Sequence, residues 1–154
     1  MNQSTKKSIP TPEEVAEQFK TGFDCSQVVV EYFSEEMGLS LEDARKLTAC
    51  FGGGSGRGGT CGAVVGAMMA IGEQYGQYDA AHMEQKDVMR QKRNDFMDLF
   101  EQAHGTSLCR EVLGYDLSVP EERETALETG TIMTLCPRIV CDAIRMTEAV
   151  LKED

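Results

Sequence analysis

The sequence predicts an all-α protein, a compact multi-helix bundle of about six or seven helices with a glycine-rich loop. Helix-capping signals recur along the chain, and apolar residues follow the helical repeat. No segment alternates between apolar and polar residues as a half-exposed strand would. A chain of 154 residues can bury about two-thirds of its unfolded surface in one domain. We therefore expect a disordered N-terminal tail over residues 1–10 and a single helical domain over residues 11–154.

The first three predicted helices each begin at a capping residue. Thr11 is an N-cap, followed by a proline at the first helical position and a capping-box glutamate, Glu14. The second helix begins at Asp24 and ends at Gly38, and the third begins at Ser40. In chain order, these helices are expected over residues 12–20, 24–37 and 40–50.

The second half of the chain has longer predicted helices. The helix that begins at Thr60 contains small residues at spacings of three and four, which form a smooth stripe that another backbone could approach closely. The longest helix is ended by Gly105, the short helix after it by Gly114, and the last helix begins at Pro137. These three are expected over residues 79–104, 106–113 and 137–151, with one or two helical turns within 121–127.

The composition limits the partners of the protein. A net charge of −11 makes nucleic acids and anionic membranes poor partners, because binding to both depends on lysine and arginine. The N-terminus lacks the apolar stretch of a signal peptide, and the longest apolar run, residues 61–71, is too short to cross a bilayer. We therefore expect a cytoplasmic protein, whose cysteines are reduced, redox-cycling or metal-bound.

Four of the six cysteines stand where a helix is predicted to begin, and they are the candidate redox and metal-binding residues: Cys25, Cys61, Cys109 and Cys136. The first turn of a helix has unpaired N–H groups and a partial positive charge, which stabilise a thiolate over a thiol. Thiolates are the form that attacks disulfides and ligates metals. Cys50 and Cys141 fit the simpler role of a small apolar residue.

A glycine-rich run precedes Cys61. Residues 54–59 fit the pattern G-x-G-x-x-G, but a helix is predicted before them, whereas a dinucleotide-binding motif follows a strand. Consecutive glycines can instead point backbone N–H groups inward and bind an anion. The alternative is a flexible connector. On the first interpretation, the candidate cofactor-binding residues are Gly53, Gly54, Gly58 and Gly59.

The spacing of the cysteines leaves three kinds of site open. The sequence contains no C-x-x-C pair, so the spacing does not indicate a zinc finger. The absence of C-x-x-C-H excludes covalently attached haem. Four thiolates could bind an iron–sulfur cluster, bind structural zinc in a tetrahedral site, or act as dithiol pairs without a metal. Zinc is the least favoured, because a helical core of this size does not need a structural metal.

The cysteine blocks resemble a known family, the redox-active proteins named after their C–GCAxxG–C–C pattern. Residues 61–66, Cys-Gly-Ala-Val-Val-Gly, are similar to the central element, and residues 51–54 to its glycine-rich lead-in. Residues 24–27 resemble the first cysteine block, residues 104–114 the third, and Cys136-Pro137 the last. The resemblance covers about residues 12–151.

The resemblance implies a redox role. A related domain occurs in split-Soret cytochromes, which contain a non-haem iron–sulfur centre. The similarity therefore favours an iron–sulfur cluster, with 2Fe–2S as the expected type, on the four candidate cysteines. Because the chain lacks haem-attachment motifs, its electron donor or acceptor would be another protein. If Cys141 replaces Cys136 as a ligand, the assignment changes by one sulfur.

Two other functions stay open. The protein could be a metal-free thiol–disulfide oxidoreductase that uses a dithiol pair. It could instead be a helical interaction module, with or without structural zinc, that binds another protein through the small-residue stripe. A homodimer is a candidate assembly, and the sequence does not decide whether the protein is an enzyme.

Overall fold

The computed structural model describes residues 7–152, which fold into nine helices without a strand. In chain order these are α1 Pro12–Lys20, α2 Cys25–Phe33, α3 Leu41–Leu47, the π-helical turn η1 Gly54–Gly58, α4 Gly62–Tyr75, α5 Glu84–His104, α6 Cys109–Leu113, α7 Pro120–Glu128 and α8 Thr131–Lys152. The predicted fold class is confirmed, but the expected number of helices is slightly too low. The glycine-rich loop contributes η1, and the segment with the weakest helix signals contributes a complete helix, α7.

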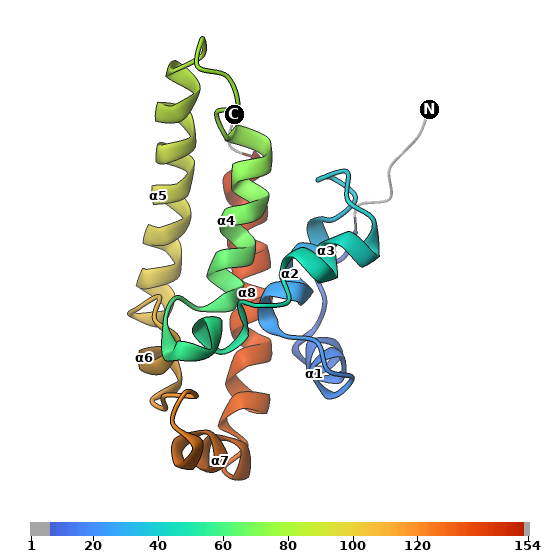
Figure 1. Cartoon of the computed structure of the whole chain (residues 1–154), viewed down its shortest axis with the longest axis vertical. Coiled ribbons are helices and arrows are strands. Elements are labelled where there is room, and N and C mark those ends of the chain that lie inside the picture. Colours follow the sequence, from blue (N-terminus) through green and yellow to red (C-terminus); the bar gives the residue numbers. More distant parts are fainter. Residues whose placement is uncertain (1–6, 153–154) are drawn as a thin grey trace.

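The long helices α4, α5 and α8 pack against one another and form the centre of the molecule (Figure 1). α2 packs against α4 and α8, and α1 packs against α8. The largest fully buried side chains are Phe96 and Phe100 of α5, Ile71 of α4 and Ile144 of α8. Burial of these apolar side chains is the main force that holds the helices together. Across the described part of the chain, no helix is both long and apolar enough to cross a membrane.

The close approach of α4 to α2 depends on small residues. A Cβ atom on Gly66 would lie 2.9 Å from the Cβ of Val29 and 3.2 Å from the carbonyl oxygen of Ser26, so glycine is required at this crossing. All five residues of the predicted stripe are buried: Gly62, Ala63, Gly66, Ala67 and Ala70. The stripe therefore packs helices of the same chain together. It is not the surface for another protein that the sequence suggested.

The last helix begins earlier than predicted. α8 begins at Thr131, after Gly130 with its left-handed φ of 72°, and Pro137 lies inside it. Proline has no N–H to donate to the carbonyl of Met133, yet the helix continues because its later turns are buried against α4 and α5. Cys136 therefore lies in the second turn of a helix. The prediction that it stands at a helix start is wrong.

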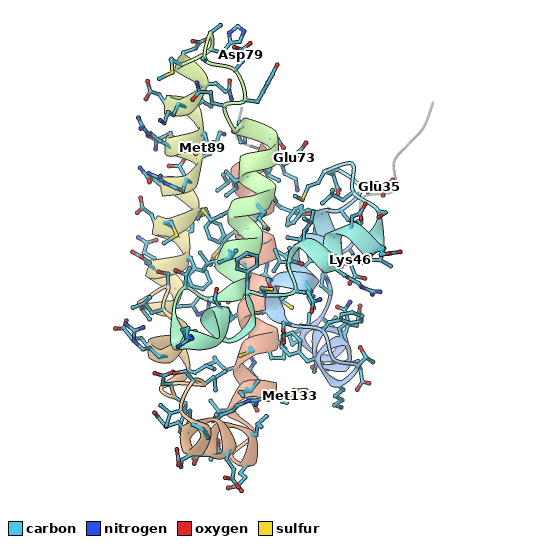
Figure 2. The ribbon with its side chains drawn as sticks, viewed as in Figure 1. Glu35, Lys46, Glu73, Asp79, Met89 and Met133 are labelled. Carbon is cyan, nitrogen blue, oxygen red and sulfur yellow. The ribbon has the colours of Figure 1, made fainter. Side chains whose placement is uncertain are left out.

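Other boundaries differ from the prediction by shorter stretches. α2 ends at Phe33 and is followed by turns over residues 34–38, and α3 ends at Leu47. α5 begins at Glu84 because the side chain of Asp79 accepts the N–H of Ala81 in a turn, at 2.9 Å. Figure 2 shows Asp79 at the end of the molecule opposite to Met133 of α8.

The described part of the predicted tail contacts the bundle. Lys7 Nζ donates a hydrogen bond to the carbonyl of Tyr32 at 3.0 Å, and the Tyr32 hydroxyl donates to the carbonyl of Lys7 at 3.1 Å. The carbonyl of Pro10 accepts a hydrogen bond from the thiol of Cys141 in α8, also at 3.1 Å. Residues 1–6, for which disorder was predicted too, lie outside the described residues.

Candidate functional site

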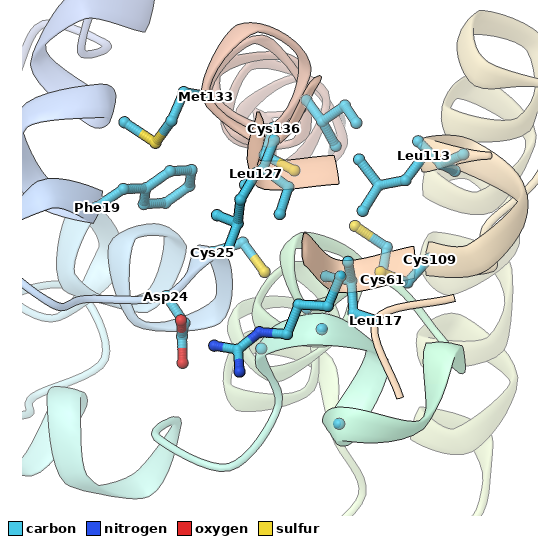
Figure 3. A pocket seen from close by; sticks show the side chains of 18 of the residues that line it. Phe19, Asp24, Cys25, Cys61, Cys109, Leu113, Leu117, Leu127, Met133 and Cys136 are labelled. Carbon is cyan, nitrogen blue, oxygen red and sulfur yellow. The ribbon is translucent and has the colours of Figure 1, made fainter. Parts of the chain in front are cut away.

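Four cysteines from four separate parts of the chain line one cavity of about 700 Å³ (Figure 3). Cys25 is the first residue of α2, Cys61 directly precedes α4, Cys109 is the first residue of α6, and Cys136 lies in α8. Their thiol groups point into a common space (Figure 3). The fold thus brings together the four cysteines that the sequence singled out, at the end of the molecule where α6 and α7 lie.

Backbone pairing places Cys61 beside Cys109. The N–H of Cys61 donates to the carbonyl of Ser107, and the N–H of Cys109 donates to the carbonyl of Gly59, both at 2.7 Å. An isolated antiparallel bridge lies between these two hydrogen bonds. Backbone hydrogen bonds therefore fix the start of α4 against the start of α6. This pairing places Cys61 next to Cys109.

Gly62 makes room for the sulfur of Cys25. A Cβ atom on Gly62 would collide with Cys25 Sγ and would lie 2.8 Å from the carbonyl oxygen of Phe51. Asp24 and Gln27 form a capping box at the start of α2, in which the N–H of Asp24 donates to Gln27 Oε1 at 2.8 Å. The first turn of α2 is thus fixed against the start of α4.

The two remaining cysteines lie away from the cavity lining. Cys50 is exposed. Cys141 is buried, and its thiol donates to the carbonyl of Pro10 at 3.1 Å. The lining of the cavity includes Cys136 and not Cys141. The geometry therefore favours Cys136 as the fourth thiol of the site.

Only one of the four candidate glycines lines the cavity. Gly53 does so, whereas Gly54, Gly58 and Gly59 do not. The N–H of Gly59 donates to the carbonyl of Gly54 at 3.1 Å, and a Cβ on Gly54 would collide with the Gly59 backbone. The carbonyl of Gly58 accepts a hydrogen bond from Arg110 at 3.1 Å. These three glycines close the loop rather than face the site.

Burial raises the pKa of the thiols in the cavity. The pKa of Cys25 lies well above its ordinary value, because burial disfavours the thiolate and because Cys61, Cys136, Asp24 and Cys109 add further negative charge nearby. Burial also raises the pKa of Cys61, partly offset by nearby backbone N–H groups at the start of α4.

The other two thiols are shifted in the same direction. Burial and the neighbouring Cys61 raise the pKa of Cys109 to about 11 and that of Cys136 to about 12, with smaller contributions from Asp116 and Cys109 respectively. The expectation that helix starts would favour thiolates is therefore wrong for the metal-free protein. The field of a helix terminus contributes about 0.3–1 kcal/mol, whereas burial of an ionised group can shift its pKa by several units.

This shift predicts slow alkylation of the metal-free, reduced protein. At pH 8, iodoacetamide should modify the exposed Cys50 at least about tenfold faster than Cys109 or Cys136, because only the thiolate reacts readily. The rates at Cys109 and Cys136 should still rise between pH 8 and pH 10. Mass spectrometry of peptides after timed quenching measures each rate. Equal rates for all three thiols at pH 8 would contradict the inferred burial.

The rest of the cavity lining is mainly apolar, with Asp24 and Arg123 as its charged residues. Sequence reasoning missed Arg123, because one arginine in an acidic exposed helix carries no signal of a site. Within residues 7–152, no group of three or more cysteine, histidine, aspartate or glutamate side chains is arranged to hold a single metal ion.

The fold and the site define a small helical protein with four clustered thiols, of which Cys61 and Cys109 are buried and Cys25 and Cys136 half-buried. The chain belongs to the family described as "Putative redox-active protein (C_GCAxxG_C_C)", whose family model matches residues 23–150. This match confirms the resemblance found in the cysteine blocks, and the family description indicates a redox role. No curated protein and no solved structure matches the chain.

Proposed function

We propose that the protein transfers electrons and that Cys25, Cys61, Cys109 and Cys136 bind an iron–sulfur cluster of the 2Fe–2S type. The observation that carries this proposal is that four thiols from four parts of the chain line one cavity. Four cysteine thiolates are the usual ligands of such clusters. When bound, a cluster of this kind accepts and releases single electrons. The redox description of the family is consistent with this role.

The protonation of the thiols supports metal binding over free dithiol chemistry. Burial raises the pKa of all four thiols, so at neutral pH the metal-free protein holds their protons firmly. Such thiols are weak nucleophiles, whereas iron displaces the proton when it binds. Structural zinc fits less well, since it requires four sulfurs about 2.3 Å from one point.

The surroundings of Cys61 would stabilise the negative charge of bound sulfur. The backbone N–H groups of Ala63 and Val64 lie beside its thiol and lower its pKa against the effect of burial. Hydrogen-bond donors near the sulfurs are among the factors that set the potential of iron–sulfur centres. Because the chain has no haem-attachment motif, the expected electron donor or acceptor is another protein, in the cytoplasm.

Anaerobic reconstitution tests the proposal. The purified chain, incubated with iron and sulfide under reducing conditions and then desalted, should retain about two irons and two acid-labile sulfides per chain. Visible absorption and electron paramagnetic resonance of the reduced form should show the cluster. A chain that retains no iron after this treatment would overturn the proposal.

One observation favours a second candidate, a thiol–disulfide oxidoreductase. The backbone pairing beside Cys61 and Cys109 holds these two thiols in neighbouring segments, as a redox-cycling dithiol would require. The same desalted preparation decides between the two. A chain without iron whose Cys61 and Cys109 become linked by a disulfide in an oxidising glutathione buffer would support this second function.

A further inference from the structure

Apart from the four cysteines, the lining of the cavity consists largely of apolar side chains. Its volume of about 700 Å³ lies within the range of about 300–1,000 Å³ that is typical of small-molecule sites. The apolar side chains that line it are Phe19, Phe23, Val112, Leu113, Leu117, Leu127, Ile132, Met133 and Ile139. In Figure 3, Phe19 and Met133 lie on one side of Cys25, and Cys61 and Cys109 lie on the other. The part of the lining beside Phe19 and Met133 therefore lies apart from Cys61 and Cys109, although apolar side chains such as Leu113 and Leu117 also lie beside those two cysteines (Figure 3).

The two charged side chains of the cavity, Asp24 and Arg123, differ in the contacts that they make within the chain. Asp24 forms the capping box with Gln27, and its side chain lies against Gly52, where a Cβ would approach its Cγ within 2.5 Å. Arg123 interacts electrostatically with Asp24. Within residues 7–152, however, the guanidinium of the exposed Arg123 makes no hydrogen bond or salt bridge. Its N–H donors are available to a ligand in the cavity.

These observations define the chemistry of a ligand. An aromatic ring or similar apolar body would pack against Phe19 and Met133, which removes apolar surface from water. A carboxylate on that body could accept two hydrogen bonds from Arg123. Asp24 and the net charge of −11 repel any anion, but they repel a singly charged carboxylate less than a doubly charged phosphate.

We propose that the cysteine cavity binds a small aromatic carboxylate, with its ring beside Phe19 and Met133 and its carboxylate on Arg123. This inference deepens the proposed function, since it places a small molecule beside the redox centre. It rests on the proposed function only for the assignment of the four thiols to a cluster.

Calorimetric titration with 2-naphthoate tests the inference, with uncharged 2-naphthol as the matched probe. We expect one saturable 2-naphthoate site per chain. Arg123→Gln should weaken 2-naphthoate binding about tenfold and leave 2-naphthol unchanged, because only the carboxylate uses the guanidinium. Leu127→Ser should weaken both probes, since Leu127 lines the cavity while 55 % exposed. Arg90→Gln and Leu47→Ser, at exposed positions outside the lining, should change neither.

A second measurement locates the ligand without relying on folding. In the cluster-free protein, saturating 2-naphthoate should slow the alkylation of Cys25 and Cys136 and leave that of Cys50 unchanged. Absence of saturable binding, or equal 2-naphthoate affinity in Arg123→Gln, would overturn the inference. Binding by a chain that retains no iron would support it while overturning the cluster. Iron retention without 2-naphthoate binding would overturn the inference alone.

Discussion

Replacement of Cys136 by serine is expected to lower the iron content of the reconstituted protein by at least about tenfold, whereas replacement of Cys141 is expected to leave it unchanged. Both residues belong to α8, but Cys136 lines the cavity and Cys141 donates its thiol hydrogen to the carbonyl of Pro10. Loss of a residue that merely orients a ligand costs about 10–100-fold in metal affinity, and loss of a ligand should cost no less. Iron and acid-labile sulfide per chain are the measurements.

Two controls separate loss of a ligand from loss of the fold. Cys50→Ser changes an exposed thiol and should alter neither the iron content nor the melting temperature. The Cys136→Ser protein should keep the circular dichroism spectrum of a helical protein in the absence of iron. If Cys141→Ser loses iron while Cys136→Ser retains it, the fourth ligand is Cys141. The cavity would then have been assigned to the wrong thiol of α8.

Replacement of Gly62 by alanine is expected to destabilise the protein by about 1–3 kcal/mol and to impair iron binding. The new methyl group would collide with Cys25 Sγ and crowd the carbonyl of Phe51, so the sulfur must take another rotamer and the loop must shift. Gly72→Ala is the matched control in the same helix, because a Cβ there meets nothing within 4 Å. That change should stabilise α4 by up to about 1 kcal/mol, the helix propensity gained over glycine.

Gly66→Ala distinguishes helix packing from the site itself. The nearest neighbours of its Cβ would be Val29 and Ser26 of α2 rather than a cysteine, so the free energy of unfolding should fall while the iron content per folded chain stays the same. Urea unfolding followed by circular dichroism measures the stability of all three variants. Retention of wild-type stability and iron content by Gly62→Ala would contradict the packing described for Cys25.

The helix signals in the sequence predicted the elements well where capping is local. Thr11, Asp24 and Ser40 cap α1, α2 and α3 as expected, because an N-cap acts on backbone groups two or three residues away. Pro137 was misread for a physical reason. Proline prefers a first helical turn, but burial of the turns that follow it in α8 outweighs the lost hydrogen bond.

The glycines also show which features were predictable from the sequence and which depended on tertiary contacts. The sequence indicated that the run before Cys61 had a structural or binding purpose, and the small-residue stripe indicated a close helix contact. It did not reveal that Gly62 faces a sulfur while Gly66 faces α2, because these contacts join segments far apart in the chain. Nor did it reveal that Gly54 and Gly59 hold the loop closed.

The sequence by itself determined the helical class, the family and the four cysteines of interest, because capping, helical periodicity and motif order are properties of neighbouring residues. Only the tertiary structure decided that the four thiols line one cavity and that Cys141 does not. It also reversed the expected direction of the pKa shift at Cys25 and Cys61. A helix start acts on a thiol through adjacent N–H groups, whereas burial depends on residues that only folding brings around it.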